Sequence, residues 1–406
     1  MIEKNYKEDF PLLQTNKTIY IDNAATAQKP AVVIEAEKRF YEESNANPLR
    51  GFYPLSLAAT EAYEDARKVV RDFIHADSEK EIIFTSGGTE SNNLAIIGAA
   101  MANRRAGNHI ITTSIEHASV ENPMEFLKEQ GFEITYLSVD ENGIISLEEL
   151  EEAVTEQTIL VSMMQVNNEI GAIEPVAEAA ELIKKKNPDT LIHVDAIQSY
   201  GKMYIYPKKL GIDMLSVSGH KIHGPKGSGF LWVKEKTKLK PLILGGGQQK
   251  GMRSGTENVP AIAGLGEAAE EIYENLDEKR AHLYGLKQRF IDGIEKLEGT
   301  HVNGKTGEDS APHIVSVSFE GIRSEVLLHS LEDRGIYVSS GSACSSNNHA
   351  GKQKGSKTLR NIHLKENLLD STLRFSFSVH TTEEEIDYAL EVLGELLPVL
   401  KKYTRH

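Results

Sequence analysis

The sequence of 406 residues contains one cysteine, Cys344. It also lacks any uninterrupted apolar stretch of about 18 residues, the length that a membrane-spanning helix needs. One cysteine excludes an intramolecular disulfide and cannot supply the several thiolates of a zinc-ribbon or iron–sulfur site. The first ten residues lack the apolar core of a secretory signal peptide. We therefore expect a cytoplasmic protein in a reducing compartment, with no membrane association and no metal site.

Basic residues are too few for a nucleic-acid-binding surface. Lys and Arg number 45 against 60 Asp and Glu, which gives a net charge of -15. Direct nucleic-acid binding requires a basic surface, so the composition argues against it. A basic partner protein stays possible, because a negative field speeds its approach.

Apolar strands and amphipathic helices alternate from Glu81 to about Val233. Helical patterns such as Glu90–Asn103 and Val176–Lys186 separate several of the strands. This order predicts an α/β fold with a mostly parallel seven-stranded sheet and helices on both faces. The expected strands are Glu81–Thr85, His109–Thr113, Glu133–Val139, Thr158–Gln165, Leu191–Asp195, Met214–Ser218 and Gly229–Val233.

The remainder of the chain, from about Asn258, predicts a smaller α+β region that begins with a long helical stretch. We expect a large domain of residues 16–270 and a small domain of residues 1–15 and 271–406, which carries the Cys344 segment. A cleft between them is the expected place for chemistry. The expected elements are strands His313–Phe319, Ile336–Ser339 and Ser371–Ser376, with helices Ser324–Arg334 and Thr382–Lys402.

Lys221 follows a predicted strand, within the sequence SGHKIHGPKG. Its amine can form a Schiff base with an aldehyde when it loses its proton, and Ser218 and His220 are placed to bind a phosphate. A solvated lysine in a glycine-rich turn is the commoner explanation for a lone lysine. The segment is not a Walker phosphate loop, because GxxxxGK[ST] is not matched.

Two further strand ends carry chemistry of the same kind. Asp195 ends a strand, where an acid can hold the protonated nitrogen of a pyridine ring or cap a helix. Gly88 and Thr89 lie where a strand meets a helix, and free N–H groups there can cradle a phosphate. Many strand–helix turns look this way, so the second signal is weak by itself.

His117, Asn168 and Arg374 also lie in or after strands. His117 is able to stack on a flat cofactor and move protons, and Asn168 to bond a ring hydroxyl or a substrate carboxylate. As isolated residues, both are more often ordinary hydrogen-bonding residues of a loop. Arg374, inside an apolar strand, needs a partner, either a substrate carboxylate or a structural carboxylate.

Cys344 stands in a run of small polar residues, SSGSACSS, followed by a polar, basic stretch that reaches Lys357. Most unpaired cysteines are buried fillers, but this one has only Ala343 as an apolar neighbour. Nearby lysines favour the thiolate, which is the reactive form. We expect a nucleophile on a mobile loop that reaches both a cleft and an outside acceptor.

Taken together and in this order, the motifs SGHKIHGPKG, HVDAIQS, VNNEIG, RSGT and SSGSAC resemble the cysteine desulfurases of the fold-type I (class V) pyridoxal-phosphate enzymes. The NifS/IscS-like branch is the most similar, and the resemblance covers nearly the whole chain, from residue 20 to residue 387. The segments AQKP (27–30) and PLRG (48–51) are more similar to the SufS-like branch. The segment SKTLRNI (356–362) is an unusual version of the helix that normally follows the cysteine loop. These departures leave the sulfur acceptor open.

The resemblance implies a role for each candidate residue. Lys221 matches the Schiff-base lysine that also moves protons at the substrate carbon, Asp195 the pyridine-nitrogen partner, His117 the histidine stacked on the ring, and Cys344 the persulfide nucleophile. The other implied roles are contact with the ring hydroxyl for Gln198; phosphate binding for Gly88, Thr89, Ser218 and His220; a phosphate contact from the other subunit of a homodimer for Thr256; cofactor and substrate binding for Asn168; and substrate binding for Asn23 and Arg374.

The activity that the resemblance implies is conversion of L-cysteine to L-alanine. Sulfur passes to Cys344 as a persulfide, and then to an acceptor protein such as an iron–sulfur scaffold or a tRNA-thiolation relay. The alternative enzyme is a selenocysteine lyase or another class V lyase or aminotransferase. The non-enzymatic alternative is a cofactor-fold subunit of a sulfur-transfer assembly, and the intact lysine, aspartate, histidine and cysteine set argues against it.

Overall fold

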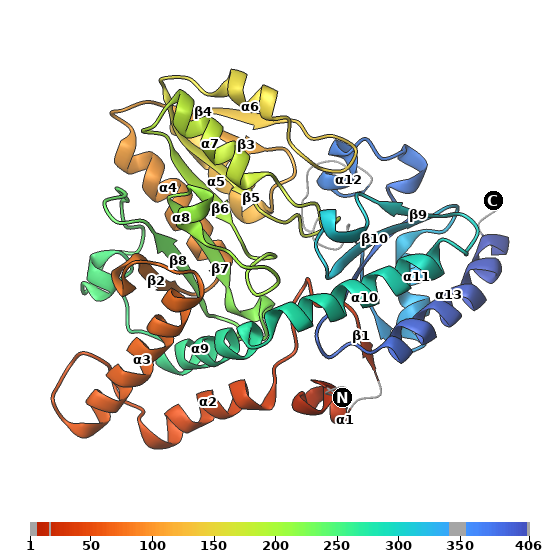
Figure 1. Cartoon of the computed structure of the whole chain (residues 1–406), viewed down its shortest axis with the longest axis horizontal. Coiled ribbons are helices and arrows are strands. Elements are labelled where there is room, and N and C mark those ends of the chain that lie inside the picture. The colour runs from red at the N-terminus through yellow and green to blue at the C-terminus, as the bar shows by residue number, and fades with distance from the viewer. Residues whose placement is uncertain (1–5, 16–17, 341–354, 404–406) are drawn as a thin grey trace.

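The computed structural model describes residues 6–15, 18–340 and 355–403. Its largest feature is a seven-stranded sheet in the order β2-β8-β7-β6-β5-β3-β4 (Figure 1). β8 is antiparallel to both of its neighbours and the other pairings are parallel, which confirms the predicted mostly parallel sheet. The strands are β2 (Ile82–Thr85), β3 (His109–Thr113), β4 (Glu133–Leu137), β5 (Thr158–Met164), β6 (Leu191–Asp195), β7 (Met214–Ser218) and β8 (Gly229–Val233).

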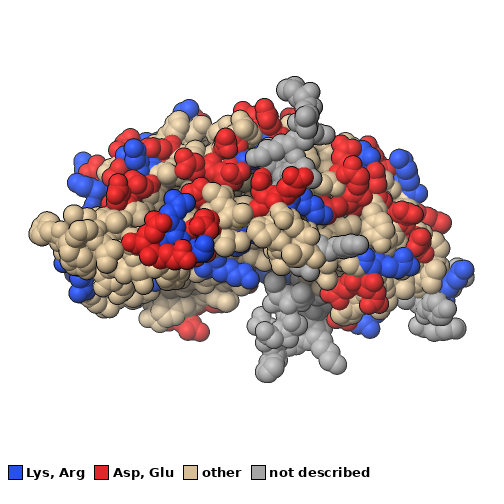
Figure 2. Space-filling model, turned by 90° about the horizontal axis from the view of Figure 1, so that it is seen from below, with Lys and Arg blue, Asp and Glu red and all other residues tan. Residues whose placement is uncertain are grey.

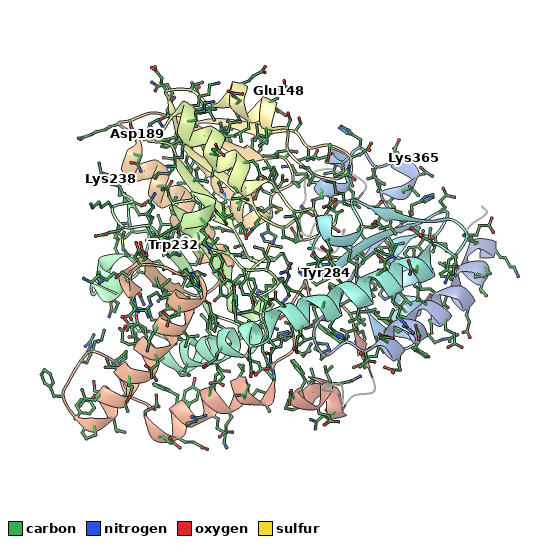
Figure 3. The ribbon with its side chains drawn as sticks, viewed as in Figure 1. Glu148, Asp189, Trp232, Lys238, Tyr284 and Lys365 are labelled. Carbon is green, nitrogen blue, oxygen red and sulfur yellow. The ribbon has the colours of Figure 1, made fainter. Side chains whose placement is uncertain are left out.

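Helices cover this sheet, and the burial of its strands follows from that. Every residue of β2, β3, β5, β7 and β8 is buried, whereas the edge strand β4 is half exposed. Trp232 of β8 lies fully buried within this layer and donates its indole N–H to Glu81 at 3.3 Å (Figure 3). The helices are α2 (Ala31–Glu43), α3 (Pro54–Phe73), α4 (Gly88–Asn103), α5 (Ala118–Glu129), α6 (Leu147–Ala153), α7 (Val176–Lys186), α8 (Pro207–Leu210) and α9 (Val259–Tyr273).

A smaller antiparallel sheet lies beside the large one, in the order β12-β13-β10-β9 (Figure 1). Its apolar residues form a second core with the helices that follow α9. Acidic residues begin the last helix, α13, and lysines end it, as the helix dipole favours. The elements are β9 (Thr300–Asn303), β10 (Ile314–Phe319), β12 (Ser339–Ser340), β13 (Thr372–Ser376), α10 (Leu276–Ile294), α11 (Ser324–Glu332), α12 (Lys357–Asn361) and α13 (Glu383–Tyr403).

The expected strand Ile336–Ser339 is wrong as a single element. The structure divides it into β11 (Ile336–Tyr337), which pairs in parallel with β1 (Ile19–Tyr20), and β12, which pairs antiparallel with β13. The chain changes sheets at Val338 because β1 and β13, distant in sequence, supply the two sets of hydrogen bonds.

The N-terminal segment contacts both cores. Phe10, which precedes the short helix α1 (Pro11–Thr15), and Leu13, which lies in it, pack on the core of the large sheet. Ile21 packs on the core of the small sheet. The domain limits expected from the sequence, at residues 15/16 and 270/271, stay a proposal. Within the described ranges, no helix combines the length and the apolar character needed to span a bilayer.

Candidate functional site

The candidate residues converge at the carboxyl ends of neighbouring strands, where ligands of parallel sheets bind. Asp195 is the last residue of β6, and Ser218 the last residue of the adjacent strand β7. Lys221 ends the 3-10 turn that directly follows β7. Lys221 and Asp195 are close enough for the charge of the lysine to lower the pKa of the aspartate.

Asp195 is buried, with its carboxylate held by two donors. The backbone N–H of Ile197 donates to Oδ1 at 2.9 Å, and Nδ2 of Asn92 donates to Oδ2 at 2.8 Å. Burial raises the pKa of Asp195, and these donors together with His117 and Lys221 act in the opposite direction. The result is a fixed carboxylate placed to receive a cation.

His117 is connected to Asp195 through one chain of hydrogen bonds. As the N-cap of α5, its Nδ1 accepts from the backbone N–H of Ser119 at 3.1 Å and lies 2.8 Å from the Ser119 hydroxyl. Nδ2 of Asn92 donates to that hydroxyl oxygen at 2.9 Å as well as to Asp195. Because Nδ1 accepts from the N–H of Ser119, the proton of a neutral His117 ring lies on Nε2.

The imidazole of His117 is also tuned electrostatically. The residue is accessible to solvent, yet surrounding protein atoms desolvate the ring and lower its pKa. The charge of Asp195 raises that pKa and the charge of Lys221 lowers it. The net lowering favours the neutral ring, which is suited to stacking on a flat cofactor and to exchanging a proton.

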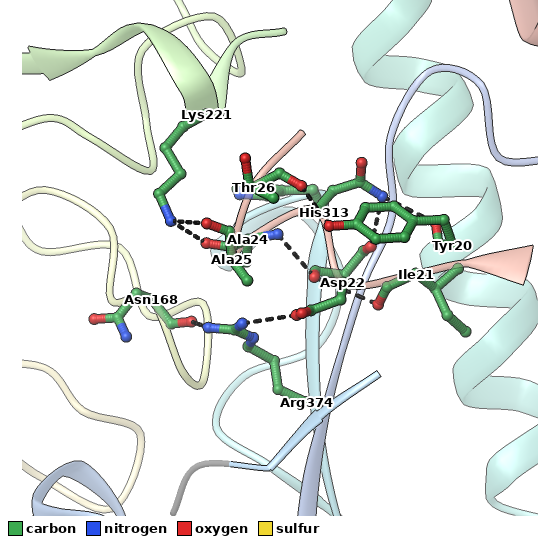
Figure 4. Close-up of polar contacts among 12 residues, drawn as sticks. Tyr20, Ile21, Asp22, Ala24, Ala25, Thr26, Asn168, Lys221, His313 and Arg374 are labelled. Atoms are coloured by element: carbon green, nitrogen blue, oxygen red, sulfur yellow. Dashed lines mark hydrogen bonds and ion pairs between the residues drawn. The ribbon is translucent and has the colours of Figure 1, made fainter. Parts of the chain in front are cut away.

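Lys221 extends toward the loop after β1 (Figure 4). Its Nζ donates to the carbonyl oxygens of Ala24 and Ala25, each at 2.6 Å. Nε2 of Gln198 donates to the same Ala24 carbonyl at 3.0 Å, and Oε1 of Gln198 lies 3.3 Å from Nε2 of the buried His313. Gln198 is therefore buried near the lysine amine.

The turn between β2 and α4 has the features of a phosphate site. Gly87 is the N-cap of α4 with a φ of 142° and offers no side-chain cap, so the first N–H groups of a 16-residue helix stay open to an anion. A Cβ on Gly88 would come 2.1 Å from Cδ1 of Ile197, so any larger residue there would require the Ile197 side chain to move. The buried residue Ser218 lies against the turn, 3.5 Å from where a Cβ on Gly87 would stand.

Three further residues, Thr89, His220 and Thr256, are predicted to contact the phosphate. Thr89 is exposed in the first turn of α4, and Nδ1 of His220 lies 3.2 Å from Oγ1 of Thr26. Thr256 is exposed on the loop before α9. That loop is held to the first turn of α4, because Nε of Arg253 donates to Oε1 of Glu90 at 2.8 Å.

Arg374 lies on β13 and connects the two sheets (Figure 4). Nη1 donates to the backbone carbonyl of Asn168 and Nη2 to Oδ1 of Asp22, both at 2.9 Å. Its Nε is buried and has no acceptor among the described residues. The structure therefore brings Asn168 to Arg374 through the backbone of Asn168, not through its amide side chain.

Asn23 has its side-chain groups engaged by the protein. Nδ2 donates to the carbonyl oxygens of Tyr20 and Ser376, both at 3.1 Å, and Oδ1 lies 3.2 Å from Nε2 of His380. These bonds hold the loop after β1 in place. Substrate binding by Asn23 stays a prediction. Cys344 lies outside the described residues.

Sequence reasoning did not assign roles to two residues that hold candidate residues in place. Asn92 bonds both Asp195 and Ser119, and Asp22 pairs with Arg374. Asn92 lies in the predicted helix Glu90–Asn103, and Asp22 directly precedes the candidate residue Asn23. What the sequence could not indicate is that Asn92, in the first turns of α4, faces a strand 103 residues away.

These features fit pyridoxal phosphate. An amine and a buried carboxylate lie at adjacent strand ends, and an uncapped helix N-terminus lies beside Ser218. Lys221 would hold the aldehyde carbon, Asp195 the ring nitrogen, and the α4 turn the phosphate.

Comparison with known proteins agrees with this geometry. Residues 19–389 match the family model described as aminotransferase class-V. The chain is 43% identical to the cysteine desulfurase IscS of Clostridium botulinum (strain Hall), covering 94% of this chain and 95% of that one. Among solved structures, a NifS-like protein is 38% identical with a TM-score of 0.88, over 94% of this chain and 100% of that one. A structure of SspA in complex with cysteine is 34% identical with a TM-score of 0.76, over 90% of this chain and 100% of that one.

Proposed function

Because the chain belongs to the class-V aminotransferase family and, within it, to the cysteine desulfurases, we propose that it removes the sulfur of L-cysteine and releases L-alanine. The sulfur passes to the thiol of Cys344 as a persulfide. One cysteine and one thiol give one alanine and one persulfide, so the reaction needs no external oxidant or reductant.

The family depends on pyridoxal phosphate. When bound, this cofactor withdraws electrons from the α-carbon of an amino acid, which makes the α-proton acidic and the carbon–sulfur bond breakable. The chain's own residues supply the positioning and the proton transfers.

Three side chains act on the reacting centre. The Asp195 carboxylate, fixed by Ile197 and Asn92, would hold a positive charge at the nitrogen of the bound cofactor's ring. The amine of Lys221 takes and returns the proton of the substrate's α-carbon. His117, neutral and protonated at Nε2, exchanges protons with the substrate.

Arg374 orients the substrate by its carboxylate. The guanidinium keeps Nε–H without an acceptor among the described residues, while its Nη groups are held by Asn168 and Asp22. A carboxylate at that side completes the hydrogen bonding of a buried group, which supports this assignment.

The thiolate of Cys344 then attacks the sulfur of the bound substrate. The bond that forms is sulfur–sulfur and the bond that breaks is carbon–sulfur, whose electron pair stays with the carbon skeleton that becomes alanine. The convergence of Lys221, Asp195 and His117 at one sheet edge supports the proposal most strongly.

The test is incubation of the cofactor-loaded protein with L-cysteine, measuring alanine and the mass of the peptide that contains Cys344. We expect alanine to form and the peptide to gain the mass of one sulfur atom. Cys344→Ser should still show the substrate-dependent change in cofactor absorbance, and should form no persulfide because the acceptor sulfur is gone.

Two outcomes would contradict the proposal. Alanine formation that survives Cys344→Ser at the parental rate would favour a lyase or aminotransferase that uses no thiol. A stronger preference for selenocysteine than for cysteine would favour a selenocysteine lyase.

A homodimer is part of the same proposal. Large apolar side chains are exposed on the loop between α2 and α3, in the first turn of α3 and on the loop that leads to Thr256. Figure 2 shows an area with few charged side chains at the end of the molecule where the α2–α3 loop lies in Figure 1. A second copy that covers this area could bring its Thr256 to the phosphate site. The exposed residues are Leu49, Phe52, Tyr53, Leu55, Leu57, Leu242, Ile243 and Leu244.

The last step proposed is delivery of the persulfide sulfur to an acceptor protein, an iron–sulfur scaffold or a thiolation relay. The net charge of -15 suits a basic acceptor. The free thiol of Cys344 stays reduced in a reducing compartment, which supports work in the cytoplasm.

A further inference from the structure

The short helix α12 directly follows the segment that carries Cys344, and its apolar side packs on the core of the large sheet. Leu359 and Ile362 are 1% and 4% exposed and belong to that core. Ser356 caps the helix, because its Oγ accepts from the N–H of Leu359 at 3.1 Å. This packing keeps α12 folded when a polar contact at its surface is removed.

An ion pair joins α12 to α5. Nζ of Lys357 lies 2.6 Å from Oε1 of Glu121, with 39% and 32% of the two side chains exposed. The same ammonium lies 5.4 Å from the centre of the Tyr136 ring on β4. Lys357 is thus held between a carboxylate and an aromatic ring of the large sheet's layer.

Two further contacts lie on either side of this pair. Nδ2 of Asn361 donates to the carbonyl of Ser114 at 2.5 Å. At the other end, burial raises the pKa of Glu169, and the hydroxyls of Ser356 and Thr358, which face its carboxylate, act in the opposite direction.

These contacts reach the two loops that carry His117 and Asn168. Glu121 belongs to the helix whose N-cap is His117, and Ser114 precedes His117 on the same connection. Glu169 follows Asn168, whose carbonyl accepts from Arg374. Helix α12 therefore contacts both the connection that carries His117 and the loop that carries Asn168 and Glu169.

From this arrangement we infer that the Lys357–Glu121 pair is a positioning contact for sulfur transfer, which sets where the chain after Cys344 returns to the large sheet relative to His117. The inference rests on the proposed desulfurase function. Neither residue touches the reacting atoms. Their effect is on how often the thiolate reaches the substrate sulfur, so it belongs to the step that forms the persulfide and not to the earlier removal of the α-proton.

The experiment measures the two steps separately in the cofactor-loaded protein. Exchange of the cysteine α-proton with deuterated water, followed by NMR, reports the early step. The rate of mass gain on the Cys344 peptide reports sulfur transfer. In Lys357→Met and Glu121→Gln we expect transfer to slow about two- to fivefold, the range of a partly exposed ion pair. Proton exchange and KM for cysteine should stay at the parental values.

Two variants make the outcome specific. The exchanged pair Glu121→Lys with Lys357→Glu should recover most of the transfer rate, because it restores the attraction with the charges reversed. Lys128→Met removes the ion pair between Lys128 and Glu125, which lies within α5 and does not reach α12, and should transfer sulfur at the parental rate.

Each possible failure has a distinct signature. A parental rate of sulfur transfer in Lys357→Met would overturn the inference. An equal slowing of proton exchange and sulfur transfer would also overturn it, because that result indicates a general loss of structure. If the parent protein forms no persulfide from cysteine, the proposed function itself fails.

Discussion

At the scale of single residues, the electrostatics of the site depend on which of two buried acids, Asp195 and Glu116, is ionised. Glu116 is buried beside the Asp195 region, with Oε1 accepting from Oγ1 of Thr113 at 2.7 Å and from the N–H of Met164 at 2.9 Å. Its Oε2 has no partner among the described residues. Burial raises the pKa of Glu116 to about 8, and the charge of Asp195 adds to the shift. A neutral Glu116 leaves Asp195 without a second negative charge behind it.

This protonation state predicts a pH-dependent effect of Glu116→Gln. The folded protein keeps a proton on Glu116 that the unfolded chain loses above pH 4.5, so the contribution of Glu116 to the stability of the parent falls with rising pH until the pH reaches about 8. The slope is about 1.4 kcal/mol per pH unit. Glutamine imitates the protonated acid and has no such slope.

Thermal and denaturant unfolding at about pH 5.5 and about pH 7.5 measure this effect. The variant should gain about 2 to 3 kcal/mol relative to the parent between the two values. Glu152→Gln, at an exposed position on α6, is the control. A stability difference that does not change with pH would show that Glu116 is ionised throughout.

At the scale of elements, helices meet closely only where small residues permit it. A Cβ added to Gly266 of α9 would lie 2.8 Å from Cβ and 2.9 Å from Cα of Ala66 on α3, so the two helices would have to move apart. A Cβ added to Gly285 of α10 would meet no atom of the described residues within 4 Å. The same substitution therefore has opposite effects in two neighbouring helices.

We predict that Gly266→Ala destabilises the protein by about 1 to 3 kcal/mol through overpacking. Gly285→Ala should stabilise it by about 0.5 to 1 kcal/mol, because alanine loses less conformational entropy in a helix. Denaturant unfolding of both variants at one pH is the measurement. A neutral or stabilising effect of Gly266→Ala would mean that the α3–α9 contact is looser than the backbone positions indicate.

At the scale of the whole molecule, the main feature is the exposed apolar area on two loops. Phe52 is 96% exposed and Leu244 is 78% exposed, on two loops that belong to the large sheet's layer. Residues of this size in contact with water are typical of an interface. The proposed homodimer would bury both loops and complete the phosphate site with Thr256.

We predict that Phe52→Asp combined with Leu244→Asp separates the dimer into single chains. The parent should have twice the 44.9 kDa mass of one chain in light scattering, and the variant should have the mass of one chain. Because a monomer lacks the second subunit's Thr256, it should also release pyridoxal phosphate faster during dialysis. Val399→Asp, at an exposed apolar position on α13, should stay dimeric and keep the cofactor. A parent protein that is monomeric at micromolar concentration would contradict the proposal.

Much of the fold and of the site could be predicted from the sequence. Most strands of the large sheet are largely apolar runs that helices bury on both sides, and the ends of all seven strands lie within two residues of the expected ends. Lys221, Asp195, His117 and Ser218 could be selected because they follow such strands, and the carboxyl ends of parallel strands meet at one edge. Local sequence therefore indicates which polar residues can reach a common ligand.

The tertiary structure decided the partners of those residues. Asn92 with Asp195, Asp22 with Arg374, and Lys357 with Glu121 are each separated by more than a hundred positions, and no local pattern encodes such a pairing. The same is true of the change of sheets at Val338, which depends on two strands from opposite ends of the chain. Composition and periodicity report how a segment is buried, whereas the choice of neighbour depends on how all segments pack together.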